Sequence, residues 1–164
     1  MNTNDVPILV RREIEARIAG PLIKAFMKKF GREETIAVAS EVILNLAEES
    51  GQQLAERCGG NSLEHLSNGT GQWSAGGALK RDVLEKTNSK YNYNIVRCKY
   101  AEMYKELGLE ELGFIFSCGR DGKMFGGFNP NIKFERTQTI MQGADYCDFR
   151  LSLEVADTPS PSEN

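Results

Sequence analysis

The chain has 164 residues, of which 40% are hydrophobic and 26% charged, and its formal net charge is −3. This size and composition are ordinary for one globular domain with its own hydrophobic core. The pI near 5.3 and the lack of a basic stripe argue against nucleic acid as the main partner, and the apolar runs are too short for a membrane-spanning helix. We expect a single domain over residues 1–156, followed by a disordered tail, 157–164, rich in proline and serine.

The N-terminus and the cysteine usage point to a cellular compartment. Residues 1–5 lack the basic head and apolar core of a signal peptide, which favours the cytoplasm, where the four cysteines should be reduced. There is no Cys-x-x-Cys pair and His65 is the only histidine, so a structural zinc site with paired ligands is not expected. The sequence requires no cofactor, but a divalent metal held by distant cysteines and Asp121 stays an open alternative.

The first third of the chain predicts two long helices. Apolar residues recur every four positions in residues 8–30, which indicates one face of a helix, with a kink or a break at Gly20-Pro21. A second amphipathic helix is expected over residues 32–57. Because these helices carry more apolar surface than a small sheet can cover, we expect a homo-oligomer, most simply a two-fold dimer through them.

The middle of the chain mixes short elements. A short helix over residues 61–68 carries His65, whose role the sequence leaves open. Small residues then surround the only tryptophan, Trp73, which suits core packing or close approach to a ligand. A helix is expected to continue through Val83 and Leu84 to about Lys86.

The second half alternates strands and helices. Alternation and turn residues predict strands at 91–99, 132–141 and 147–155, with helices over 100–107 and 109–118 between the first two. Cys118 is expected at the end of the second of these helices or just past it. The resulting fold class is α+β, with the N-terminal helices packed on a small antiparallel sheet of about three strands.

Residues 97–150 hold several unlike polar groups among apolar ones, which is typical of a functional site. Asp121 follows Cys118 in a turn that also contains Arg120. A thiolate beside an arginine has a lowered pKa and is a better nucleophile, so Cys118 is a candidate nucleophile. The alternative is that Cys118 and Cys147 only pack as small hydrophobic side chains.

Several motifs in this half occur in a fixed order. They are Trp73-x-Ala75-Gly76-Gly77-Ala78-Leu79, Arg97-Cys98-x-Tyr100-Ala101-Glu102-Met103-Tyr104, Glu111-Leu112-Gly113, Ser117-Cys118-x-Arg120-Asp121, Gly127-Phe128-Asn129-Pro130 and Arg136-Thr137-Gln138-Thr139-Ile140-Met141-x-Gly143-Ala144-x-x-Cys147-Asp148-Phe149-Arg150. Over roughly residues 60–154 this string resembles the L-2-amino-thiazoline-4-carboxylic acid hydrolase family.

The resemblance implies a hydrolase that opens the ring of L-2-amino-thiazoline-4-carboxylate, or of a related small cyclic amidine carboxylate, to N-carbamoyl-cysteine. Such a substrate suits an arginine for its carboxylate and a carboxylate for its amidine. Attack at the ring carbon needs an activated water, metal-bound or not, or a thiol. The candidate catalytic residues are therefore Cys118, Asp121 (base or amidine anchor) and Cys147, and the candidate substrate-binding residues are Arg136 (carboxylate clamp), Thr137, Arg120, Asp148 and Trp73.

The alternative function is a non-catalytic domain that binds a small molecule or a metal. Helices followed by a small sheet with a cysteine near its end are also similar to 4-vinyl-reductase-like ligand-binding domains. A protein interaction module is a third candidate. Convergence of Cys118, Asp121, Arg136 and Cys147 on one pocket would favour a functional site over mere packing. The role of Cys98 stays open.

Overall fold

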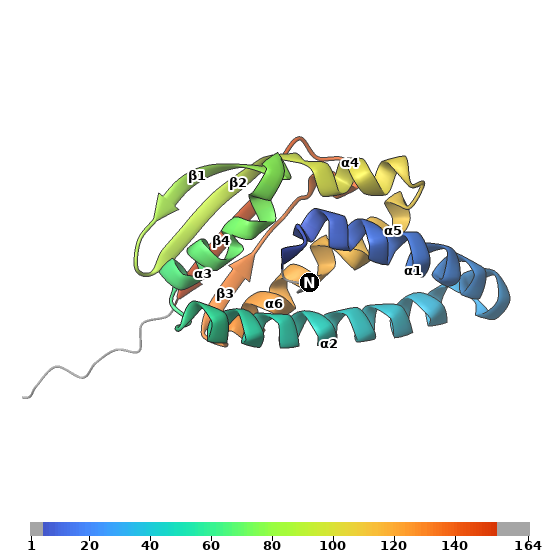
Figure 1. The fold of residues 1–164 in the computed structure, drawn as a ribbon, viewed down its shortest axis with the longest axis horizontal. Helices are drawn as coiled ribbons and strands as arrows, with labels where there is room; N and C mark the ends of the chain where they lie inside the picture. Colours follow the sequence, from blue (N-terminus) through green and yellow to red (C-terminus); the bar gives the residue numbers. More distant parts are fainter. Residues whose placement is uncertain (1–4, 154–164) are drawn as a thin grey trace, which may run out of the picture.

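The computed structural model describes residues 5–153 (Figure 1). Its α-helices are α1 (Ile8–Phe30), α2 (Arg32–Cys58), α3 (Leu63–Gly69), α4 (Lys99–Glu106), α5 (Glu110–Phe116) and α6 (Asp121–Phe128), and its short 3-10 helices include η2 (Thr70–Gly77), η3 (Cys118–Arg120) and η4 (Ile140–Gln142). Its strands are β1 (Leu79–Lys86), β2 (Lys90–Cys98), β3 (Ile132–Glu135) and β4 (Cys147–Leu153). The tail expected at 157–164 and the end of the strand expected at 147–155 lie outside the described residues.

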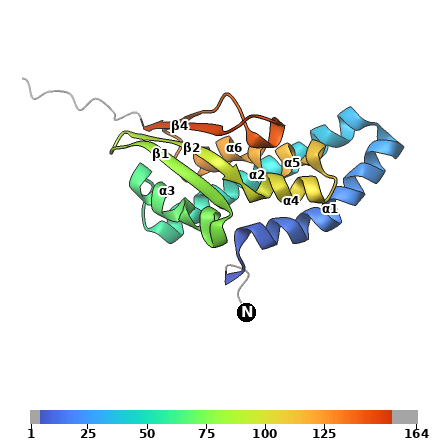
Figure 2. The ribbon, with the colours of Figure 1, turned by 90° about the horizontal axis from the view of Figure 1, so that it is seen from above.

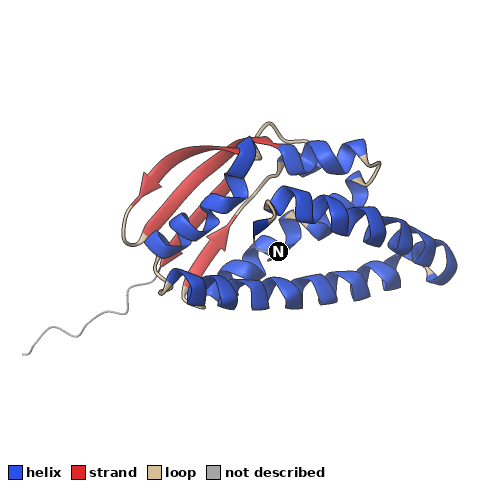
Figure 3. Cartoon of the chain, in the orientation of Figure 1, coloured by secondary structure: helices blue, strands red, loops and turns tan. Residues whose placement is uncertain are grey.

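The four strands form one antiparallel sheet in the order β1-β2-β4-β3. Tyr93 of β2 and Phe149 of β4 are paired across the sheet, and their rings stack with centroids 4.8 Å apart. Helices α2, α3 and α6 supply the rest of this main core. The strands gather at one end of the molecule, while α1 and α2 extend away from them (Figure 3). The α+β class and the packing of N-terminal helix on sheet are confirmed.

The strand β1 comes from a segment for which the sequence predicts a helix. Leu79–Lys86 instead lies at the edge of the sheet, where it pairs with β2. The helical prediction is wrong because the segment has no clear apolar period: Val83 and Leu84 are neighbours and both are exposed. Its structure is decided by pairing with β2 rather than by local sequence.

Helix α6 was also missed by sequence reasoning, which predicts no element between the helix expected at 109–118 and the strand expected at 132–141. The helix ends just before Asn129-Pro130 and crosses α2 with the two backbones nearly in contact. A Cβ atom on Gly51 of α2 or on Gly127 of α6 would lie 2.1 Å from a backbone oxygen of the other helix. Glycines that weaken an isolated helix are therefore required here for the packing of α6 on α2.

Of the kink or break expected at Gly20-Pro21, the break into two helices does not occur, because α1 is one helix through this point. It packs on α4 and on the turn before α5, where Ala16, Tyr104 and Leu109 belong to a second, smaller core. Seen from above, α1 lies along the same side of the molecule as α4 (Figure 2). Within residues 5–153, no helix has both the length and the apolar character needed to cross a bilayer.

Candidate functional site

A cavity of about 300 Å³ lies where α1, α2, the sheet and the turn from α5 into α6 meet. Some of the residues that line it are more than a hundred positions apart in the sequence. Six of the eight candidate site residues line it: Cys118, Asp121, Cys147, Arg120, Arg136 and Trp73. The four residues whose convergence would favour a functional site are all among them.

Asp121 and Arg136 form an ion pair in this cavity. Asp121 is the first residue of α6, and Arg136 follows directly after β3. Arg136 donates from Nη1 to Asp121 Oδ2 at 2.6 Å and from Nη2 to the carbonyl oxygen of Cys118 at 2.9 Å. Its guanidinium carbon also lies 5.4 and 5.2 Å from the ring centroids of Phe134 and Phe149. Arg136, expected to bind a substrate carboxylate, is therefore oriented and largely neutralised by Asp121.

The carboxyl group of Asp121 is suited to proton transfer. Burial raises the pKa of Asp121 to about 6, although the charge and the hydrogen bond of Arg136 act in the opposite direction. No residue in the described part of the chain donates a hydrogen bond to its second oxygen, Oδ1. A carboxyl group with a pKa near neutrality can accept a proton and return it at physiological pH.

The thiol of Cys118 is not activated in the way that the sequence suggests. Its side chain is buried, and it lies in η3, two residues before Arg120. Burial, reinforced by the charge of Asp121, raises the pKa of Cys118, and the opposing charge of Arg136 does not cancel this effect. Cys118 is therefore a neutral thiol at neutral pH rather than a thiolate.

Two further thiols line the cavity and are also protonated. Burial raises the pKa of Cys147, whose sulfur accepts a hydrogen bond from the backbone N–H of Ile140 at 3.2 Å. Burial raises the pKa of Cys98 to about 11, and its sulfur accepts a hydrogen bond from Ala101 at the start of α4. Both sulfurs thus hold the backbone of a neighbouring turn.

The cavity is rich in cations. Besides Arg136, its lining contains Arg11, Arg12, Arg57 and Arg120, against one carboxylate among the described residues, Asp121. Arg12 forms an ion pair with Glu15, whereas Arg120 makes no hydrogen bond or ion pair within residues 5–153. Burial, together with the charge of Arg12, lowers the pKa of Arg120 to about 10, although the charges of Glu15 and Asp121 act in the opposite direction. A partly buried cation that is not engaged in an ion pair attracts an anionic ligand.

Two candidate residues, Thr137 and Asp148, lie outside the cavity lining. Asp148 accepts hydrogen bonds from the backbone N–H and the hydroxyl of Thr137, at 3.0 and 2.6 Å, and from the N–H of Gln138 at 2.9 Å. Burial raises the pKa of Asp148, but these hydrogen bonds outweigh it and the net shift is downward. They also explain why β3 ends at Glu135 and not at 141: the chain after Glu135 is tied to Asp148 and leaves the ladder.

These contacts give Thr137 and Asp148 a positioning role, because they fix the segment that begins with Arg136. His65 is likewise held locally, with its Nδ1 2.7 Å from the hydroxyl of Ser62, the residue that caps α3. It does not line the cavity. Within residues 5–153, no group of three or more His, Cys, Asp or Glu side chains is arranged to hold a metal ion.

Sequence reasoning missed the cations that the N-terminal helices contribute, Arg11, Arg12 and Arg57. One signal was available: α1 has no acidic residue in its first turn, and the arginine pair Arg11-Arg12 follows instead, near the end of the helix where the dipole disfavours cations. A local arrangement that opposes helix stability often marks a functional position.

Comparisons with known proteins name a family and show a similar fold among solved structures. A family model described as L-2-amino-thiazoline-4-carboxylic acid hydrolase matches residues 11–151. A search of curated proteins gives no match. Among solved structures, the chain is similar to the crystal structure of the phenol-responsive sensory domain of the transcription activator PoxR with phenol. The TM-score is 0.53 and the identity 11%, over 82% of this chain and 72% of that one. At this identity the likeness shows the fold alone.

Proposed function

The chain belongs to the L-2-amino-thiazoline-4-carboxylic acid hydrolase family, and from this premise we propose that it opens the ring of L-2-amino-thiazoline-4-carboxylate or a closely related cyclic amidine carboxylate. The product of the named substrate is N-carbamoyl-cysteine. One observation carries the proposal: a carboxyl group with a pKa of about 6, Asp121, and a cation without an ion pair in the described residues, Arg120, line the same cavity. Its volume of about 300 Å³ suits a small ligand.

Recognition of the substrate follows from the charges of the cavity. We assign the substrate carboxylate to Arg120 rather than to Arg136, because Arg136 is already paired with Asp121. Arg11 adds a second donor, since its Nε is buried and has no hydrogen-bond partner. Trp73 lines the same space and provides an apolar surface for the ring.

The reaction requires addition of one water and cleavage of the bond between the ring carbon and sulfur. Asp121 accepts a proton from the attacking water through its free oxygen, Oδ1, while the water oxygen bonds to the amidine carbon. As the carbon–sulfur bond breaks, the electron pair leaves with sulfur and protonated Asp121 returns its proton to that sulfur. The second water hydrogen ends on the ring nitrogen, which yields the carbamoyl group and a free thiol.

Attack by a protein thiol is the less supported route. It would form a covalent bond between Cys118 or Cys147 and the amidine carbon, and water would release the product in a second step. Burial raises the pKa of both thiols, so neither supplies thiolate readily at neutral pH. Water activated by Asp121 therefore accounts better for the chemistry.

The test is formation of N-carbamoyl-cysteine from L-2-amino-thiazoline-4-carboxylate, followed by chromatography and mass spectrometry. Asp121→Asn should lower the rate by at least about 100-fold, the scale of a positioned acid–base group. Asp82→Asn is the matched control, because Asp82 is an exposed carboxylate on β1 that does not line the cavity, and it should retain most of the activity. Wild-type protein that forms no product, with or without added divalent metal, would refute the proposal.

A second candidate is a non-catalytic domain that binds a small molecule, as the sequence analysis also allowed. The observation that favours it is the structural likeness to a sensory domain solved with phenol. Calorimetry separates the two functions: a binding domain would hold the thiazoline carboxylate and return it unchanged. Arg120→Gln should weaken the binding in either case, because the carboxylate loses its cation.

A further inference from the structure

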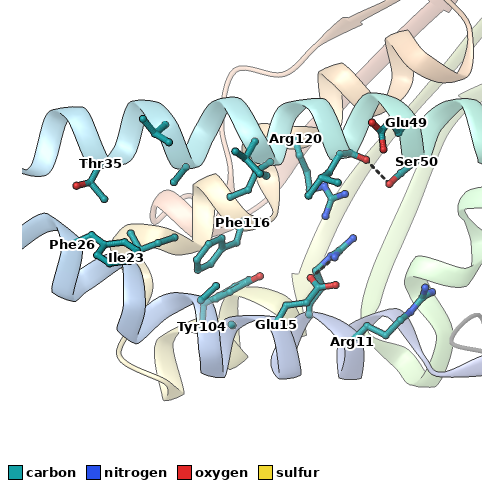
Figure 4. Close-up of a pocket in the computed structure, with 18 of the residues that line it drawn as sticks. Arg11, Glu15, Ile23, Phe26, Thr35, Glu49, Ser50, Tyr104, Phe116 and Arg120 are labelled. Atoms are coloured by element: carbon teal, nitrogen blue, oxygen red, sulfur yellow. Dashed lines mark hydrogen bonds and ion pairs between the residues drawn. The ribbon is translucent and has the colours of Figure 1, made fainter.

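A long groove runs between α1 and α2, next to the cavity but distinct from it (Figure 4). Its volume is about 910 Å³, and Tyr104 and Phe116 lie on its floor. Most of its lining is apolar and comes from the two long helices. Five large apolar side chains of the groove are more than 40% exposed: Phe26, Phe30, Val38, Val42 and Leu46. A surface of this kind is normally covered in the functional state of a protein.

A second apolar surface lies on α1 alone. Val10, Ile14, Ile18 and Leu22 are spaced four residues apart, so they form one row along the helix. None of these four residues lines the groove, and their exposure lies between 42% and 65%. We call this row the ridge. The chain thus exposes both an apolar groove between α1 and α2 and an apolar ridge on α1.

We propose that a second copy of this chain covers both surfaces at once. The ridge of each copy packs into the groove of the other, around a two-fold axis. A two-fold dimer requires a self-complementary surface, in which each element of one copy meets a different element of its partner and the reverse. A chain that carries one ridge and one groove of like chemistry meets this requirement, and ridges that fit grooves are the usual mode of helix packing.

The exposed area agrees with this occupant. The groove and the ridge together present nine large apolar side chains, each roughly half exposed. They offer on the order of 800 Å², about what one partner contributes to a standard-size protein interface. The two surfaces together are therefore large enough for a stable dimer.

A second copy in the groove would also close the cavity. The two spaces share Arg11, Arg12, Ser50, Gln53 and Arg120, so the cavity adjoins the groove through these residues. In Figure 4, Arg11, Ser50 and Arg120 lie at one end of the groove. Each ridge would thus exclude water from the cavity of the other copy. This part of the proposal concerns access to the cavity and does not depend on the reaction proposed above.

The first test is the mass in solution. Light scattering should give twice the 18.3 kDa mass of the chain at micromolar concentration. Ile18→Lys in the ridge and Val42→Glu in the groove should each raise the dissociation constant of the dimer by at least about 100-fold, because an unpaired charge would be buried. Val83→Glu is the matched control, because Val83 is 51% exposed against 53% for Val42 but lies on β1. Light scattering of the Val83→Glu variant should still give the mass of the dimer.

The second test asks whether the ridge meets the groove. When the monomeric variants Ile18→Lys and Val42→Glu are mixed, a mixed dimer should form. In it, one contact pairs the new lysine with the new glutamate and the other contact is native. Mixing would restore nothing if ridge packed on ridge, and that result would overturn the reciprocal arrangement. Circular dichroism of each variant tests whether that variant is folded.

The third test measures closure of the cavity. Iodoacetamide should alkylate Cys118 at least about tenfold faster in the Val42→Glu monomer than in the wild-type dimer, because access controls the reaction of a buried thiol. Cys58, a half-buried thiol that lines neither space, serves as the internal reference in the same digest. An unchanged Cys118 rate would overturn the closure. A wild-type monomer, or a monomer that carries a bound amphiphile in native mass spectrometry, would overturn the dimer itself.

Discussion

The sheet half of this molecule and its α1–α2 half use apolar residues in opposite ways. In the sheet half, Tyr93, Phe125 and Phe149 pack on one another and are almost completely buried. On α1 and α2, Ile18 and Val38 are 65% and 64% exposed. The apolar residues of the sheet half form a buried hydrophobic core, whereas α1 and α2 carry apolar surface that the chain itself does not cover. The cavity lies at the boundary between these two halves and takes groups from both.

The largest difference between the halves should be in stability. Phe125→Ala should lower the free energy of unfolding by about 3–5 kcal/mol, since it removes a ring packed 4.9 Å from that of Phe134. Phe30→Ala, at an exposed position of α1, should cost less than about 0.5 kcal/mol in dilute protein. Urea titration measures both, and repeating it at high concentration should reveal a cost for Phe30→Ala once the dimer forms. If the two variants lost equal free energy of unfolding in dilute protein, the proposed difference between the two halves would be contradicted.

The next effect concerns the pH dependence of ring opening. The pKa of Asp121 is raised from 3.8 to about 6, and only its carboxylate form can accept a proton. The value of kcat/KM should therefore rise about tenfold per pH unit below pH 6 and become constant above it. The residual kcat/KM of Asp121→Asn should not show this rise below pH 6. A rise that instead ended near pH 4 would mean that the catalytic carboxyl group is not buried as described.

A smaller effect is expected for substrate binding. Arg120→Gln should raise KM by at least about tenfold and change kcat little, because the substrate carboxylate loses a charged donor in both the ground and transition states. Arg97→Gln is its control, since Arg97 is an exposed arginine of β2 that pairs with Glu102 and does not line the cavity. Steady-state kinetics of the two variants would test whether substrate recognition depends on Arg120. A larger KM for Arg97→Gln than for Arg120→Gln would contradict the assignment.

The smallest effect is expected for the thiol. Cys118→Ser should keep kcat within about tenfold of wild type, because we propose water as the attacking group and the buried thiol is protonated. Rapid-mixing measurements should likewise show no burst of a covalent intermediate. A loss of more than about 100-fold, or a trapped adduct on Cys118, would establish the thiol route. Cys147→Ser would then show whether the second thiol contributes.

The sequence predicts those elements well whose residues carry a clear period. The helices at 8–30 and 32–57, the strand at 91–99 and the α+β class were all readable from periodicity, and the structure has them within a residue or two. Prediction from sequence fails where a contact with residues far away in the chain determines the secondary structure. β1 is a strand because β2 pairs with it, and α6 tolerates glycine at position 127 because α2 approaches there.

The site shows the same division. Cys118, Asp121 and Arg120 are neighbours in sequence, so one motif indicates all three, and Arg136 and Cys147 were found through their own motifs. The arginine pair Arg11-Arg12 marks an unusual position near the start of a helix, but neither this signal nor the pattern around Arg57 says which cavity these residues line, because the rest of that cavity comes from residues far along the chain. The pairing of Thr137 with Asp148 also depends on a turn that sequence alone does not fix.

Helix α2 lines both the cavity and the groove. Gly51 is pressed against α6, the helix that begins at Asp121, while Ser50 and Gln53 face both the cavity and the groove. A ligand in the cavity and a second chain in the groove would thus both contact the same helix, α2. Thermodynamic reciprocity then applies: whatever factor dimerisation adds to ligand affinity, the ligand must return to dimer affinity. The abundance of the protein would itself act as an effector of its site.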